Sequence, residues 1–260
     1  MKPYDVIFLS ASLPYREPWV SEVQPAEVEQ AIVSIARAVF ARGGRLLFGG
    51  HPSISPLIAD IAGEYYPVDR RREVRPIVTV QSEFFEDKLP QKTWDLYTTG
   101  WSEIAWTPTG TNREDSLETM RNAMLGIGDL GREIAKRNQL SRPIAMFAVG
   151  GMEGIRDEAA IFLQAMEHSA VFALKTPGAA AARLLESPGQ WRERLWPADA
   201  FSRDRYQALI LGKEQRRLID LEQQWADELV RRELELPKFE LQPYGTMVQW
   251  VLDEVFDVKL

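Results

Sequence analysis

Arg121 and Glu158 are two charged residues whose types suit chemistry on a phosphorylated sugar. An arginine guanidinium can hold a phosphate through two parallel hydrogen bonds. A carboxylate beside a ribose can stabilise the positive charge that develops at the anomeric carbon when a glycosidic bond breaks. Each residue also has an ordinary interpretation, because Arg121 can pair with Glu118 on its own helix and Glu158 can favour a helix N-terminus from the first turn. The residue types alone leave both interpretations open.

Glycine pairs follow two predicted strands, at Phe48-Gly49-Gly50 and at Val149-Gly150-Gly151. Glycine lets the backbone approach a phosphate or sugar closely, and the helix that follows directs free N–H groups at an anion. Because ligands of open parallel sheets lie beyond the carboxyl ends of the strands, we predict a ligand site here, with structural turns as the alternative. The predicted ligand-binding residues are Ser10, Ala11, Ser12, Gly49, Gly50, His51, Arg121, Gly150, Gly151, Met152, Glu153 and Gly154.

The string Gly126-Ile-Gly-Asp-Leu-Gly131 matches the dinucleotide-binding pattern G-x-G-x-x-G letter for letter. That pattern binds a dinucleotide only when a strand precedes it and a helix follows it. Here a predicted helix over residues 113–125 comes before the glycines. We therefore interpret the string as a helix end or a flexible connector.

Motifs for metal binding and nucleophilic catalysis are missing from the sequence. The chain has two histidines far apart and no cysteine, which makes a zinc site improbable, and we predict neither a metal nor a cofactor. It has no G-x-S-x-G motif and no P-loop lysine. His51 follows the first glycine pair, where it can contact a ligand or order its own loop; the sequence leaves both open.

Composition argues against duplex nucleic acid and a membrane as partners. The formal charge of −7 argues against duplex nucleic acid, because phosphate neutralisation needs clustered Lys and Arg. The longest apolar runs have the length of a strand, well short of the ~20 residues that span a bilayer, and the first residues do not form a signal peptide. Absence of cysteine fits a reducing compartment. We expect a cytoplasmic protein with no membrane partner.

The elements that must position these residues alternate between strand and helix patterns through residue 186. This order predicts an α/β, Rossmann-like fold: a mostly parallel sheet with helices on both faces. Residues 10–14 are predicted as a small-residue loop and residues 83–101 as an irregular segment. Strands are predicted at 6–10, 45–48, 76–80, 103–106, 144–149 and 170–174, and helices at 25–42, 56–65, 113–125, 155–166 and 179–186.

Two domains are predicted, a nucleotide-binding domain over residues 1–187 and a helical C-terminal extension over 188–260 that packs on it. The extension is expected to begin with an irregular connector and to contain charged helices over 202–234 and an amphipathic helix over 244–256. Four large apolar residues repeat at helical spacing in its first part. That stripe predicts either packing on the core or a homo-oligomer surface, and consists of Leu218, Leu221, Trp225 and Leu229.

Two segments resemble the motifs of the SLOG superfamily, which unites LOG-type phosphoribohydrolases, DprA/Smf proteins and nucleotide-sensing domains associated with TIR and sirtuin proteins. The segment Met120-Arg-Asn-Ala-Met124 is similar to the LOG helix motif M-x-x-R-K-x-x-M. The segment Val149-Gly-Gly-Met-Glu-Gly-Ile-Arg-Asp-Glu158 is similar to P-G-G-x-G-T-x-x-E. The first glycine loop also fits the order of elements in the family, and the resemblance covers residues 4–175.

The chain departs from the LOG pattern at four places. Asn122 replaces a lysine, Val149 a proline and Ile155 a threonine, and Glu153 adds one residue before Gly154. These departures are more similar to the sensor-type branch, which is linked to prokaryotic antiviral and conflict systems.

The resemblance implies binding of a nucleotide-derived signal, for example an NAD-derived cyclic ADP-ribose. The alternative is a LOG-like nucleotide N-glycosidase, in which Arg121 would hold the phosphate and Glu158 would stabilise an oxocarbenium-like transition state. A third hypothesis is a structural or interaction protein on a Rossmann-like frame, since a fold does not imply a function.

Overall fold

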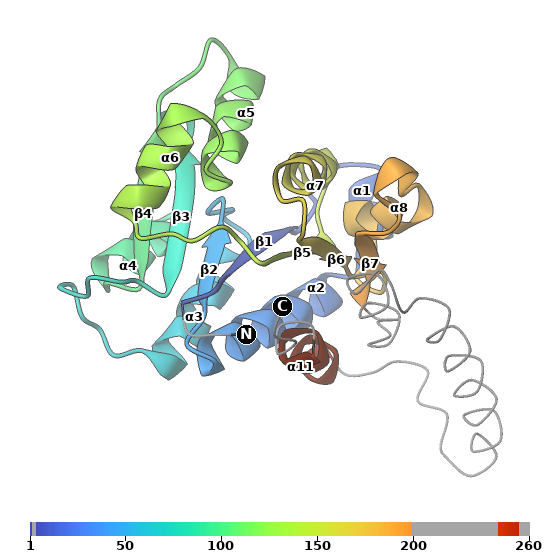
Figure 1. The fold of residues 1–260 in the computed structure, drawn as a ribbon, viewed down its shortest axis with the longest axis horizontal. Helices are drawn as coiled ribbons and strands as arrows, with labels where there is room; N and C mark the ends of the chain where they lie inside the picture. Colours follow the sequence, from blue (N-terminus) through green and yellow to red (C-terminus); the bar gives the residue numbers. More distant parts are fainter. Residues whose placement is uncertain (2–3, 199–243, 255–260) are drawn as a thin grey trace.

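A seven-stranded sheet forms the centre of the chain, as the alternation of strands and helices predicted (Figure 1). The computed structural model describes residues 1, 4–198 and 244–254. The strands lie in the order β4-β3-β2-β1-β5-β6-β7, and each neighbouring pair is parallel. They are β1 (Val6–Ser12), β2 (Arg45–Phe48), β3 (Ile77–Ser82), β4 (Ser102–Thr107), β5 (Ala145–Gly150), β6 (Ala170–Ala173) and β7 (Leu195–Pro197).

Helices cover both faces of this sheet (Figure 1). The first buried cluster unites α2, α3 and α11 with one face, and the second unites α5, α6, α7 and α8 with the other. The helices are α1 (Trp19–Glu22), α2 (Pro25–Ala41), α3 (Ser55–Tyr65), α4 (Gln91–Thr98), α5 (Arg113–Met124), α6 (Gly128–Arg137), α7 (Glu153–Ala165), α8 (Ala179–Glu186) and α11 (Tyr244–Glu254), with 3₁₀ turns η1 (Glu83–Lys88) and η2 (Gly189–Trp191).

The strand order reverses at β1, which makes its carboxyl end the expected place for a ligand. Strands β2, β3 and β4 extend from one edge of β1, and β5, β6 and β7 extend from the other. The pairing of β1 with β5 continues as far as Ser12 opposite Gly150, so the two strands end side by side. The loops after these strands therefore begin next to each other, although they are about 140 residues apart in the chain.

Side chains alternate between the two faces along β1, because successive residues of a strand point in opposite directions. Leu9 and Ala11 belong to the cluster under α2, while Phe8 belongs to the cluster under α7. Ser10 and Ser12 share the face of Phe8. This alternation directs both hydroxyls toward the face covered by α5 and α7, the helices that follow β4 and β5.

Three of the expectations for local structure are wrong. The predicted loop over residues 10–14 begins too early, because Ser10–Ser12 pair with β5 and complete β1. The segment 83–101 is ordered as η1 and α4, where Leu96 and Thr93 are buried against the core. The connector after residue 187 contains β7, whose three residues extend the sheet beside β6. Short elements such as these have too few residues for a periodic pattern.

The glycine string that mimics a dinucleotide motif spans the turn between α5 and α6. A helix precedes it, as predicted, and α6 begins at Gly128, so the string is no flexible connector. Gly131 lies inside α6 with its Cα close against Gly126, where an added Cβ would be 2.8 Å from the Gly126 carbonyl carbon. The glycines therefore permit a tight helix–helix turn.

The C-terminal helix α11 packs on α2 and ends the described part of the chain. Tyr244, Met247, Val248, Val251 and Leu252 are buried in the first core cluster. The predicted helix over residues 244–256 is confirmed for residues 244–254. The charged helices expected over 202–234, and with them the Leu218/Leu221/Trp225/Leu229 stripe, lie outside the described residues. The division into two domains stays a prediction.

Candidate functional site

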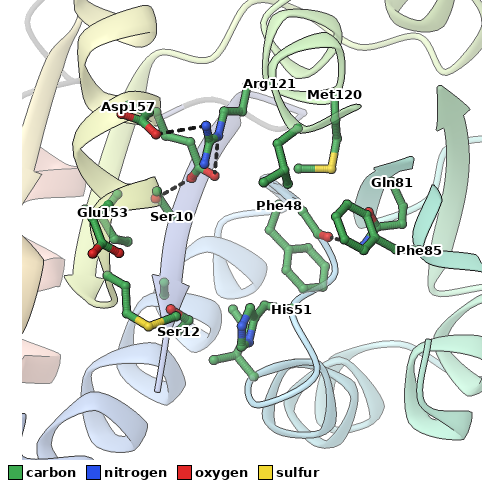
Figure 2. A pocket seen from close by; sticks show the side chains of 18 of the residues that line it. Ser10, Ser12, Phe48, His51, Gln81, Phe85, Met120, Arg121, Glu153 and Asp157 are labelled. Atoms are coloured by element: carbon green, nitrogen blue, oxygen red, sulfur yellow. Dashed lines mark hydrogen bonds and ion pairs between the residues drawn. The ribbon is translucent and has the colours of Figure 1, made fainter. Parts of the chain in front are cut away.

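A cleft of about 730 Å³ opens at the carboxyl ends of β1, β2 and β3, between α5 and α7. Figure 2 shows Ser10, Glu153 and Asp157 on the side of α7, and Phe48, Gln81 and Phe85 on the side of β2 and β3. The predicted site residues that line the cleft are Ser10, Ala11, Ser12, Gly49, His51, Arg121, Met152, Glu153, Gly154 and Glu158.

Glu158 is held by two groups that come from different elements. Ser10 Oγ donates a hydrogen bond to Glu158 Oε2 at 2.5 Å, and Arg121 Nε lies 3.7 Å from Glu158 Oε1. Because α7 begins at Glu153, Glu158 is in the second turn of the helix, and the prediction of the first turn is wrong. Its role as a favourable charge at the helix N-terminus is weaker there, since that effect fades after the first turn.

Burial raises the pKa of the Glu158 carboxyl above its ordinary value. The hydrogen bond from Ser10 and the charge of Arg121 favour the carboxylate and oppose this rise, but desolvation is the largest effect. Displaced pKa values of this origin are frequent at functional sites, because a group that acts on a ligand must be withdrawn from water.

Arg121 joins α5 to α7. Its Nη1 lies 3.0 Å from Asp157 Oδ2 (Figure 2). Its Nη2 lies so close to Gly154 that a Cβ added to this glycine would be 2.9 Å away. Among the described residues no ion pair joins Arg121 to Glu118, the partner that its own helix offered. The side chain of Arg121 is only 14% exposed, whereas that of Asp157 is 55% exposed. The guanidinium therefore packs against the first two turns of α7 rather than extending into solvent.

Three of the predicted glycines do not line the cleft: Gly50, Gly150 and Gly151. All three have positive φ angles, of 68°, 59° and 75°. An added Cβ would meet Thr79 Cγ2 at 2.6 Å from Gly50, and Ile155 Cγ1 at 2.2 Å from Gly151. The N–H of Gly151 donates to the carbonyl of Ser12 at 2.9 Å. Their positive φ angles and close neighbours give these glycines a role in the turns, and contact with a ligand stays a prediction for them.

The N-terminus of α7 supplies the remaining part of the polar wall. Met152, Glu153 and Gly154 line the cleft, and no side chain caps the helix at Met152. The positive end of the helix dipole therefore lies at the cleft, where it favours an anionic group. Arg16 pairs with Glu153 at 2.7 Å, which attaches the segment after β1 to the first turn of α7.

His51 lines the cleft and also orders its own loop, so neither interpretation excludes the other. Its Nδ1 lies 2.8 Å from Ser53 Oγ, and the backbone N–H of Ser53 donates to the same nitrogen at 3.3 Å. Burial lowers the pKa of the imidazole. The ring is therefore neutral at physiological pH.

Sequence reasoning missed the wall that β3 and η1 provide. Phe48, Gln81, Phe85, Lys88 and Leu89 line this side of the cleft. The side-chain amide of Gln81 donates to the carbonyl of Gly49 at 2.9 Å and accepts from the N–H of Ser82 at 2.9 Å. The signal was available, because β3 is parallel to β2 and its carboxyl end must reach the same edge of the sheet.

Two features bear on other classes of ligand. No helix of the described residues is long and apolar enough to cross a membrane. In the described part of the chain, no group of three or more His, Asp or Glu side chains is placed to hold a metal ion.

Comparison with known proteins identifies one family. The model of the SLOG cluster3 family matches residues 19–204, well over half of the chain. Among solved structures, the X-ray structure of TM1055, a structural genomics target, is similar with a TM-score of 0.42 and 14% identity, over 72% of this chain and 81% of that one. At that TM-score the likeness supports no conclusion of its own. No curated protein matches the chain significantly.

Proposed function

The chain belongs to the SLOG cluster3 family, and from that membership and the cleft we propose that it binds a nucleotide-type small molecule. The observation that carries the proposal is the polar corner where Ser10, Arg121 and Glu158 meet at the point of strand reversal. Ligands of parallel α/β sheets bind at this point. The volume of the cleft, about 730 Å³, is within the range of small-molecule sites.

The two sides of the cleft differ in chemistry, which suits the two parts of a nucleotide. The α7 side offers hydroxyls, a guanidinium and the positive end of a helix, which are groups that bind sugars and phosphates. The β2–β3 side offers Phe48 and Phe85, whose rings can pack against a base. We propose that the sugar and phosphate bind on the α7 side, and that the base binds on the β2–β3 side, near η1.

Binding without cleavage is the favoured function. Both carboxylate oxygens of Glu158 face protein groups, and Arg121 is engaged with Asp157 and Glu158. Because protein groups already hold the carboxylate, we propose that the corner binds a ligand without cleaving it. Following the resemblance, we propose that the ligand is an NAD-derived signal such as a cyclic ADP-ribose, read in a prokaryotic antiviral system.

A nucleotide N-glycosidase is the second candidate. The specific observation in its favour is the buried Glu158 with Arg121 beside it, because such a carboxylate can stabilise an oxocarbenium-like transition state while the arginine holds the phosphate. Glu158 and Arg121 would be the catalytic residues of that reaction. A protein with a purely structural or interaction role is the third hypothesis. Homo-oligomerisation and a cytoplasmic location stay predictions.

The test is a thermal-shift assay of the full chain across nucleoside monophosphates, NAD⁺ and cyclic ADP-ribose, with chromatography of the same samples. A rise in melting temperature without a new product is expected for a binding protein. Release of a free base, lost in Glu158→Gln but retained in the surface control Glu133→Gln, would establish the glycosidase instead. If no compound raises the melting temperature and none is cleaved, both proposals are wrong.

A further inference from the structure

The side of the cleft that β2, β3 and η1 form is mostly apolar, and three polar side chains lie on it: His51, Gln81 and Lys88. Phe48, Ile54, Phe85 and Leu89 line it, and His51 lies beside Phe48 in Figure 2. The amide of Gln81 is held in place by two backbone groups, and the ammonium of Lys88 lies over the rings of Phe84 and Phe85. His51 is therefore the residue whose hydrogen-bonding state decides what this side recognises.

The contacts of His51 determine which ring nitrogen carries the proton. The backbone N–H of Ser53 points at Nδ1, and a backbone N–H can only donate, so Nδ1 is an acceptor. Ser53 Oγ accepts from the N–H of Leu13 at 3.0 Å, which leaves its own proton to be donated to Nδ1. Both contacts agree. In a neutral imidazole whose Nδ1 accepts, the proton is on Nε2.

The Nε2–H group is the one available for a ligand. Nδ1 faces the loop of Ser53 and Leu13, while the ring itself lines the cleft. No hydrogen bond within the described part of the chain uses Nε2. A ligand that displaces water from this donor must replace the hydrogen bond, so a ligand without an acceptor there loses affinity.

We propose that His51 is a specificity-determining residue, which donates from Nε2 to a ring nitrogen or carbonyl oxygen on the edge of the ligand's base. This inference rests on the proposed function, because it needs a planar group of the ligand beside Phe48 and Phe85. It adds a requirement to the proposed function: bases with an acceptor at that edge bind, and those with a C–H at the same position are rejected.

Two substitutions separate the donor from the role of His51 in the loop. In His51→Asn, the amide oxygen takes the place of Nδ1 and keeps the contact with Ser53, but nothing occupies the position of Nε2. In His51→Gln, the amide nitrogen reaches the position of Nε2, while the contact with Ser53 is lost. If His51 donates to the ligand, His51→Asn should weaken binding more than His51→Gln does. If His51 only orders its loop, His51→Gln should be the more harmful substitution.

The measurement is calorimetry of the full chain with AMP, GMP, CMP, UMP, NAD⁺ and cyclic ADP-ribose, and then with deaza analogues of the purine that binds most tightly. We expect His51→Asn to weaken binding about tenfold and His51→Gln to change it less than about threefold, since one neutral hydrogen bond is at stake. The analogue that lacks the recognised acceptor should bind the wild type and His51→Asn equally.

The results distinguish failure of the inference from failure of the proposed function. If a nucleotide binds the wild type and His51→Asn with equal affinity, the inference is wrong and the proposed function stands. The same conclusion follows if His51→Asn and His51→Gln weaken binding equally. If no probe binds the wild type, both are wrong.

A second measurement needs no ligand. The chain has two histidines, so a long-range ¹H–¹⁵N spectrum of the untagged protein contains two imidazoles, assigned with His168→Asn. Protonated Nε2 and unprotonated Nδ1 are expected for His51, and the reverse tautomer would overturn the inference.

Discussion

Ser10 and Glu158 form a short hydrogen bond, in which Ser10 Oγ at the end of β1 donates to Glu158 Oε2 in α7 at 2.5 Å. The two residues are 148 positions apart in the chain. Their contact connects the central strand to the helix at whose N-terminus the cleft opens. Its consequences can be measured without knowing the ligand.

Ser10→Ala is expected to lower the free energy of unfolding by about 1–3 kcal/mol, because a buried carboxylate oxygen loses its donor. Urea denaturation measures this change. Ser21→Ala is the matched control, since Ser21 Oγ also donates to a carboxylate, that of Glu17, but on the surface. The control should change the free energy by less than about 0.5 kcal/mol. Equal losses of stability in the two variants would mean that burial of the contact between Ser10 and Glu158 does not stabilise the fold.

The stability of the wild type is expected to fall with rising pH relative to Glu158→Gln. Burial raises the pKa of Glu158, so the folded protein keeps the proton at pH values where the unfolded chain has lost it. Folding then binds a proton, and the free energy of unfolding decreases as pH rises from the ordinary carboxyl pKa of 4.5 through the raised pKa. Denaturation of both proteins between pH 4 and 8 measures the difference. A difference that is constant, or that grows in favour of the wild type with pH, would contradict the raised pKa.

Arg121→Met and Asp157→Asn should differ strongly in cost, although they remove the two ends of one ion pair. Asp157 is more than half exposed, so its loss should cost less than about 1 kcal/mol. Loss of Arg121 leaves Glu158 without a counter-charge in a mostly buried position, and about 2–4 kcal/mol is expected. Thermal and urea denaturation compare them. The double variant tests whether Glu158, and not Asp157, accounts for the cost of losing Arg121. Its cost should then stay close to that of Arg121→Met alone.

Gly50→Ala is expected to destabilise the fold by about 1–3 kcal/mol without changing the affinity of the folded protein for its ligand. Gly50 has a φ of 68°, and an added Cβ would be 2.6 Å from Thr79 Cγ2, but the residue does not line the cleft. Gly245→Ala is the control, since an added Cβ there meets open space in α11 and should stabilise by about 0.5–1 kcal/mol. A Gly50→Ala protein that folds normally but fails to bind ligand would show that Gly50 belongs to the binding site.

Local sequence patterns were sufficient for the order of the main elements. Each long strand is a continuous apolar run, and each long helix repeats its apolar residues every three or four positions, as in Pro25–Ala41. The patterns were insufficient for α1, η1, α4, α6 and β7. Hydrogen bonds and packing with distant residues stabilise these short elements, which include the wall of the cleft that carries Phe85.

The sequence by itself determined that the chain is a parallel α/β protein, and that its two glycine pairs come at the carboxyl ends of strands. These properties follow from backbone preferences and hydrophobic periodicity, which act over a few residues. Only the tertiary structure decided that Arg121 pairs with Asp157 and Glu158 rather than Glu118, and that an added Cβ at Gly50 or Gly151 would meet a neighbouring side chain. The reason is that these contacts depend on strand order and helix position, which bring together side chains that no local pattern relates.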